Sequence, residues 1–116
     1  MNPSEYNISD QHRQYLLTLA YIYVKNSQSD KAIIIYEALW HVFPDTDTEN
    51  IAFCLAYLHL KTQSFEKALT YAESYLEKNP SSTGFFLKAQ ILFSLGREQE
   101  AREATHRFLN TSSQIL

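Results

Sequence analysis

The chain has 116 residues, a size typical of one domain, and 45% of them are hydrophobic while only 20% are charged. This composition excludes intrinsic disorder over most of the length. With only 2 glycines and 3 prolines, the chain lacks the turn residues that an all-β sandwich or barrel needs. The net charge of −3 and the scattered Lys and Arg residues supply no basic stripe, so we expect no nucleic-acid partner.

The first residues, MNPSEYNISD, lack the basic and apolar blocks of a signal peptide, and no apolar run is long enough to span a membrane. We therefore expect no membrane insertion and a cytoplasmic location. The lone Cys54 cannot form an internal disulfide, which fits a reducing compartment.

Apolar periodicity and helix start and stop signals predict an all-α chain. Ser64, and either Ser81 or Ser82, stand where a hydroxyl can accept hydrogen bonds from first-turn N–H groups. Pro44 and Pro80 end the helices that precede them. The six predicted helices span about residues 10–26, 29–43, 48–62, 65–79, 82–95 and 97–109.

The sequence also repeats itself. Ala32, Ala68 and Ala101 occupy matching places in three similar segments and lie 36 and then 33 residues apart, which brackets the 34-residue period of the tetratricopeptide repeat (TPR). Small residues at these places let two antiparallel helices approach closely. The preceding helices carry matching small residues at Ala20, Ala56 and Ala89. The pattern predicts a right-handed α-solenoid of three TPR-like helix pairs.

This pattern places a single domain at residues 9–109, between a flexible N-terminal tail at 1–8 and a C-terminal tail at 110–116. The three repeats are predicted at about residues 13–46, 49–81 and 82–109. Free-standing TPR arrays end in an extra polar helix that covers the last repeat. Because no such helix follows here, we expect the end of the last helix, around Phe108 and Leu109, to need a partner chain or a self-contact.

The sequence offers no catalytic or metal-binding motif. The four histidines fall on four different predicted helices, without a His-x3-His pair; they are His12, His41, His59 and His106. With only Gly84 and Gly96 as glycines, a phosphate-binding loop is not available. We expect neither an enzyme nor a metal or other cofactor.

Candidate binding residues lie on the first helix of each pair, because that helix lines the concave side of a stacked TPR array. Three rows follow i, i+4, i+7 spacing, which places each row on one helix face. The candidate groove residues are Leu17, Tyr21, Val24, Phe53, Tyr57, Leu60, Phe86, Gln90 and Phe93. An exposed strip of this kind predicts a protein-binding site for an amphipathic helix or an extended hydrophobic segment. The alternative is that the rows cover one another as core.

Several short motifs, together with the chain length and the repeat spacing, are typical of one group of TPR proteins. The motifs are Gln14-Tyr15-Leu16-Leu17, Glu37-Ala38-Leu39 before Phe43-Pro44, Glu66-Lys67-Ala68 and Ala101-Arg102. From about residue 11 to residue 109, the chain resembles the small TPR chaperones of bacterial type III secretion systems, in particular the SctY class, which includes YscY.

The resemblance implies a cytoplasmic chaperone that binds a small secreted protein of the SctX class as a 1:1 heterodimer. The chaperone would escort this partner to the export gate protein of the SctV class. The needle-subunit chaperones of the SctG class are similar in size and fold and remain an alternative. A generic TPR scaffold or adaptor that joins two proteins is the other alternative.

Overall fold

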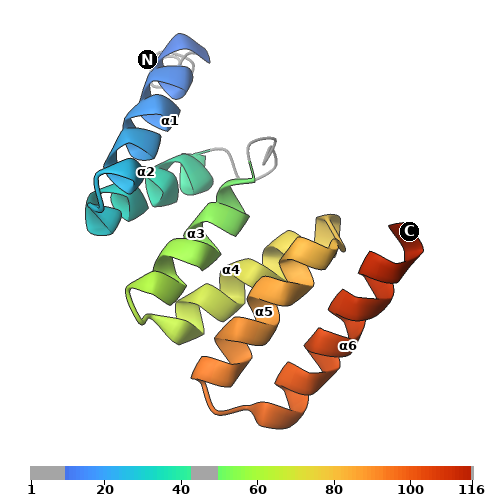
Figure 1. The fold of residues 1–116 in the computed structure, drawn as a ribbon. Helices are drawn as coiled ribbons and strands as arrows, with labels where there is room; N and C mark the ends of the chain where they lie inside the picture. The colour runs from blue at the N-terminus through green and yellow to red at the C-terminus, as the bar shows by residue number, and fades with distance from the viewer. Residues whose placement is uncertain (1–9, 43–49, 116) are drawn as a thin grey trace.

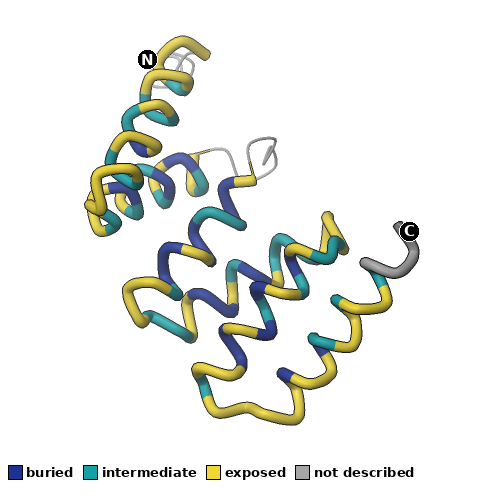
Figure 2. The backbone as a smooth tube through the Cα atoms, viewed as in Figure 1, coloured by how far each residue is buried: buried dark blue, intermediate teal, exposed yellow. Residues whose placement is uncertain are grey.

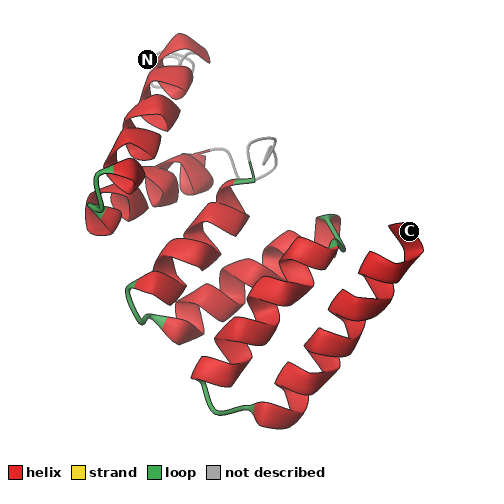
Figure 3. Ribbon diagram, in the orientation of Figure 1, coloured by secondary structure: helices red, strands yellow, loops and turns green. Residues whose placement is uncertain are grey.

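The chain folds into helices that pair antiparallel and stack one pair on the next (Figure 1). The computed structural model describes residues 10–42 and 50–115. The six helices within these ranges are α1 (Asp10–Lys25), α2 (Ser29–Val42), α3 (Ile51–Lys61), α4 (Phe65–Lys78), α5 (Ser82–Ser94) and α6 (Glu98–Ile115). Figure 3 shows only helix and loop across these ranges. The predicted all-α helical-repeat solenoid is therefore confirmed.

The last helix is longer than predicted. The sequence places a tail at residues 110–116, but the backbone of α6 remains helical to Ile115. The polar segment that follows Leu109 contains no Gly or Pro to end a helix. Thr111 Oγ1 also donates a hydrogen bond to the Arg107 carbonyl oxygen at 2.7 Å, one helical turn earlier. The predicted N-terminal tail, residues 1–8, lies outside the described residues.

The two predicted serine caps behave differently. Ser81 Oγ accepts a hydrogen bond from the Gly84 N–H at 3.2 Å, as predicted. Ser64 does precede α4, but its side chain makes no capping bond. Its own N–H donates to the His59 carbonyl at 2.8 Å, so Ser64 belongs to the turn that ends α3 as much as to the start of α4.

The same turn joins the two helices of every pair. Ser27, Gln63 and Gly96 each have a left-handed backbone, with φ between 61° and 76°, and lie 36 and then 33 residues apart. In each turn, the N–H of the following residue donates to a carbonyl five residues earlier at 2.8–2.9 Å, as in a Schellman helix end. The left-handed turn residues therefore have the same spacing along the chain as the alanines.

Small residues lie where the helices cross, as predicted. All six of the expected alanines are buried, namely Ala20, Ala32, Ala56, Ala68, Ala89 and Ala101. Larger side chains fill the space between successive helices, the most deeply buried being Leu39, Ile51, Leu55, Leu58, Ile91 and Leu92. In Figure 2 the buried residues follow the inner sides of the helices, whereas α6 is mostly exposed.

The first helix pair is packed differently from the others. Among the described helices, the backbone of α3 comes close to that of α5, whereas the backbone of α1 comes close to that of α2 alone, and Figure 1 shows α1 standing apart from α3. Tyr36 of α2 occupies the position that Ala72 and Thr105 hold in the later repeats. The Tyr36 ring is buried at this junction, beside the space that separates α1 from α3.

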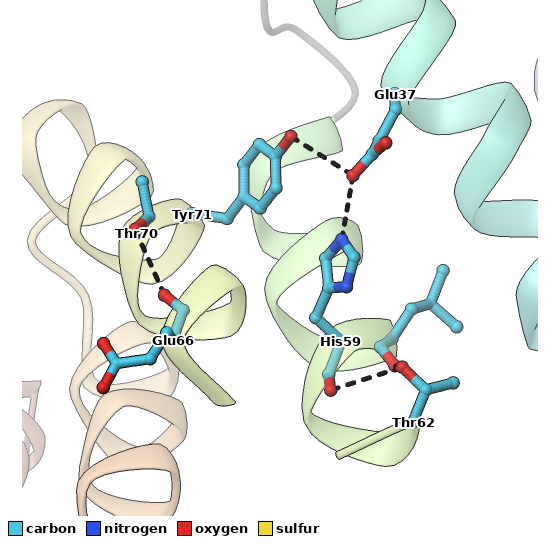
Figure 4. Close-up of polar contacts among 7 residues, drawn as sticks. Glu37, His59, Thr62, Glu66, Thr70 and Tyr71 are labelled. Carbon is cyan, nitrogen blue, oxygen red and sulfur yellow. Dashed lines mark hydrogen bonds and ion pairs between the residues drawn. The ribbon is translucent and has the colours of Figure 1, made fainter. Parts of the chain in front are cut away.

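A polar cluster joins the first repeat to the second (Figure 4). His59 Nε2 of α3 lies 2.9 Å from Glu37 Oε1 of α2, and the Tyr71 hydroxyl of α4 donates to the same oxygen at 3.5 Å. The His59 and Tyr71 rings stack with their centroids 5.7 Å apart. His59 is buried, so Glu37 satisfies a polar group that water does not reach.

We predict that the stacking of the second pair on the third is sensitive to bulk at Gly84. A Cβ there would lie 2.6 Å from Leu76 Cδ2 and 2.9 Å from Tyr75 Cε1. Gly84→Leu should therefore lower the free energy of unfolding by about 1–3 kcal/mol, measured by urea denaturation. The control is Thr83→Leu on the exposed side of the same turn. Equal effects of the two substitutions would contradict the packing described.

We also predict that Glu37→Ala destabilises the chain by about 1–3 kcal/mol, because it leaves the buried His59 ring without its acceptor. Glu73→Ala is the matched control, since Glu73 holds the same position in the second repeat and is exposed. It should change stability by less than about 0.5 kcal/mol. Urea denaturation of both variants tests the cluster, which is refuted if Glu37→Ala is as mild as its control.

Candidate protein-binding groove

The nine predicted groove residues all remain at least partly accessible to water. Those that are exposed are Tyr21, Tyr57, Phe86, Gln90 and Phe93, and those that are half-buried are Leu17, Val24, Phe53 and Leu60. Tyr21 of α1 and Phe93 of α5 are each 57% exposed. The exposed members of the rows are therefore not covered as core, whereas Leu17, Val24, Phe53 and Leu60 pack against the two core clusters.

Four of the nine residues meet in one hollow between the first and second repeats. Tyr21 and Val24 of α1 face Phe53 and Tyr57 of α3 across a space of about 160 Å³. This space lies where the backbones of α1 and α3 are apart. We call it the α1–α3 hollow. Its lining consists of rings and aliphatic side chains, which is the chemistry that accepts an apolar side chain from another molecule.

Three further residues line the α1–α3 hollow that the sequence analysis did not include, namely Tyr36, Cys54 and Leu58. Burial raises the pKa of the Tyr36 hydroxyl to about 12, and the neighbouring Cys54 thiol adds to the effect. Tyr36 is therefore neutral at physiological pH and adds no charge to the hollow. The local sequence around Tyr36 gives no sign that one edge of its ring faces a hollow.

Two lysines border the same hollow. Lys25 Nζ lies 5.7 Å from the centroid of the Tyr21 ring, and Lys61 Nζ lies 5.7 Å from that of Tyr57. These distances allow cation–π interactions. The two Lys–Tyr pairs are 36 residues apart, so the repeat period could have identified them from the sequence. They place positive charge beside an apolar surface.

The predicted residues of the third repeat line a separate hollow of about 150 Å³ between α5 and α6. Phe86, Gln90 and Phe93 lie there with Ala89 of α5 and with two residues of α6, Thr105 and Phe108. We call it the α5–α6 hollow. The single groove expected from the sequence is thus divided into two hollows, because the second helix of the last pair contributes to one of them.

The remaining two predicted residues line neither hollow. Leu17 packs against the core cluster of the first repeat, and Leu60 against that of the later repeats. The first two rows therefore have a mixed role, with one face of each helix supporting the core and the neighbouring face open to water. All three residues of the third row are exposed.

No cluster of three or more His, Cys, Asp or Glu residues that could hold a metal ion occurs in the described part of the chain. Among residues 10–42 and 50–115, no helix combines the length and the apolar character that crossing a membrane requires. The two hollows expose apolar rings, which are the candidate binding features of the described chain.

Comparison with known proteins places the chain in a family. A search of curated proteins gives no match. A family model described as "Anaphase-promoting complex, cyclosome, subunit 3" matches residues 25–108, which is more than half of the chain. The model represents a TPR-like repeat, which is a non-enzymatic scaffold fold of the kind that mediates contacts between proteins. The chain belongs to this family of TPR-like helical-repeat proteins.

Proposed function

We propose that this chain is a single-domain chaperone that holds an amphipathic segment of another protein in the α1–α3 hollow. The observation that carries the proposal is that Tyr21 and Tyr57, on successive concave helices, remain exposed at the sides of an apolar space. Exposed rings of this kind do not stabilise a folded chain in water. Aromatic side chains in a pocket, by contrast, are the residues that contribute most to protein–protein binding.

The chemistry of the hollow defines the segment that fits it. The lining accepts aliphatic or aromatic side chains, while Lys25 and Lys61 at its border favour carboxylates. An amphipathic helix with Leu, Ile or Phe on one face and Asp or Glu flanking that face satisfies both conditions. Membership in a TPR-like family supports the choice of a protein ligand.

The class of client comes from the sequence resemblance to type III secretion chaperones of the SctY class. On this proposal the client is a small secreted protein of the SctX class, held 1:1 in the cytoplasm and delivered to the export gate protein of the SctV class. The exposed rings support this role, because a chaperone must cover the apolar surface of a client that is not yet assembled.

We predict that Tyr57→Asp weakens binding of the SctX-class protein from the same genome by at least about tenfold. The substitution removes a ring from the side of the hollow and puts a carboxylate where an apolar side chain of the client would be buried, which is costly. Co-expression, purification of the complex and titration calorimetry measure the effect. The helical circular dichroism spectrum should be unchanged, since Tyr57 is exposed.

The matched control is Ile34→Asp, which changes an exposed apolar residue on α2 that lines neither hollow. Its binding should equal that of the unmodified chain. If Tyr57→Asp binds the client as tightly as Ile34→Asp does, the α1–α3 hollow is not the client site. If the SctX-class protein fails to bind the unmodified chain, the proposed client class is wrong.

A further inference from the structure

The α5–α6 hollow corresponds to a surface that is covered in the earlier repeats. Phe86 and Phe108 have ring centroids 5.3 Å apart, and the pair 33 residues earlier, Phe53 and Tyr75, has them 5.2 Å apart. In that earlier pair Tyr75 lies against α5, so close to Gly84 that a Cβ would approach it to 2.9 Å. No further helix lies beside the equivalent Phe108, because the backbone of α6 comes close to that of α5 alone among the described helices.

The first repeat shows this arrangement on its α2 side. There α3 packs on α2, and its Ile51 and Leu58 are each 1% exposed within the first core cluster, while the α1 side is open as the α1–α3 hollow. In the third repeat no described helix packs on the backbone of α6 from the far side, and Phe86 of α5 is 48% exposed. Figure 1 shows α6 at one end of the stack, with no helix on its far side. Every other repeat of the chain receives a helix at this surface.

We propose that the α5–α6 hollow binds an amphipathic helix of a partner protein, which packs as α3 and α5 pack on the first two repeats. The proposal rests on the proposed function, since Phe86, Gln90 and Phe93 belong to the predicted groove. It adds a second contact surface and specifies the side chains that fill it.

Size matching at three contacts of the first two repeats defines those side chains, whereas the fourth pair, Leu39 and Ile51, is large on both sides. Large Tyr36 meets small Cys54, and large Tyr75 meets Gly84. The converse holds where the earlier repeat has a small residue. Ala72 of α4 lies in the same core cluster as the large Leu87 of α5, the helix that packs on the second repeat. Size matching is expected at close-packed helix contacts.

In the third repeat, Thr105 is the small residue and Phe108 is the large residue of the surface that the partner helix would cover. The incoming helix therefore carries Gly or Ala against Phe108 and Leu three positions later against Thr105. A further Leu or Ile follows after four more positions, as Leu58 and Ile91 do on α3 and α5. The partner helix has the spacing Gly/Ala-x2-Leu-x3-Leu/Ile on its apolar face.

A second copy of this chain fits the hollow poorly. Among the helices that the structure describes, the open face of the right kind is on α1, where Tyr15 and Ile22 are exposed and occupy the positions of Gly84 and Ile91. Stacking α1 on the α5–α6 hollow would set Tyr15 against Phe108 and Thr18 against Thr105. This pairs large with large and small with small, which overpacks one contact and leaves the other empty.

The test uses the full chain and two labelled helical peptides of about 18 residues, long enough to hold a helix in water. One peptide carries Gly, Leu and Ile at the stated spacing with Glu, Lys and Ala elsewhere, and the other has Phe in place of the Gly. Fluorescence anisotropy should show the Gly peptide binding at least about tenfold more tightly. Equal binding, or no binding of the Gly peptide, would overturn the inference.

Variants of the chain locate the site. Phe93→Asp should weaken binding of the Gly peptide at least about tenfold, and Ile34→Asp should leave it unchanged. Tyr57→Asp should retain peptide binding while losing the client, so failure of this inference is distinguishable from failure of the proposed function. If sedimentation instead shows a dimer of the unmodified chain that Phe93→Asp dissociates, a second copy occupies the hollow and the inference is wrong.

Discussion

The structure depends on one packing constraint, which is that successive helices approach closely only where a small side chain meets a large one. Ala32 and Ala68 are fully buried at their crossings, and Gly84 makes room for Tyr75. Each helix pair satisfies this constraint on one side with its own residues and on the other side with residues of the next pair. A stack of such pairs does not close on itself, so it necessarily ends in surfaces that no helix of the stack covers.

The candidate binding surfaces lie at the first junction and at the end of the stack. Tyr36 stands where the later repeats have Ala72 and Thr105, and beside it a hollow lies where the backbones of α1 and α3 are apart. The second hollow lies at the end of the stack. Both surfaces are lined by aromatic rings with a helix on either side. Lys25 and Lys61 give charge to the first hollow only.

The helices and the repeat could be predicted because they are encoded locally. The alanine spacing, the apolar periodicity and Pro80 fix the pairs to within a few residues without knowledge of the fold. The end of α6 could not be placed, because the polar residues after Leu109 neither stop nor strongly favour a helix. The division of the groove into two hollows could not be predicted either, nor could the contact of His59 with Glu37 at 2.9 Å. Both depend on how separate helices cross. Periodicity within one helix does not contain that information.

The central claim is that rings of the α1–α3 hollow are open in the free chain and are covered by a protein partner. Hydroxyl-radical footprinting with mass spectrometry tests it most directly, because oxidation of each tyrosine reports its contact with water. The account predicts that Tyr21 and Tyr57 are oxidised much faster than the buried Tyr36 in the free chain, and that the SctX-class client protects both. Slow oxidation of Tyr21 and Tyr57 in the free chain, at the rate of Tyr36, would contradict it.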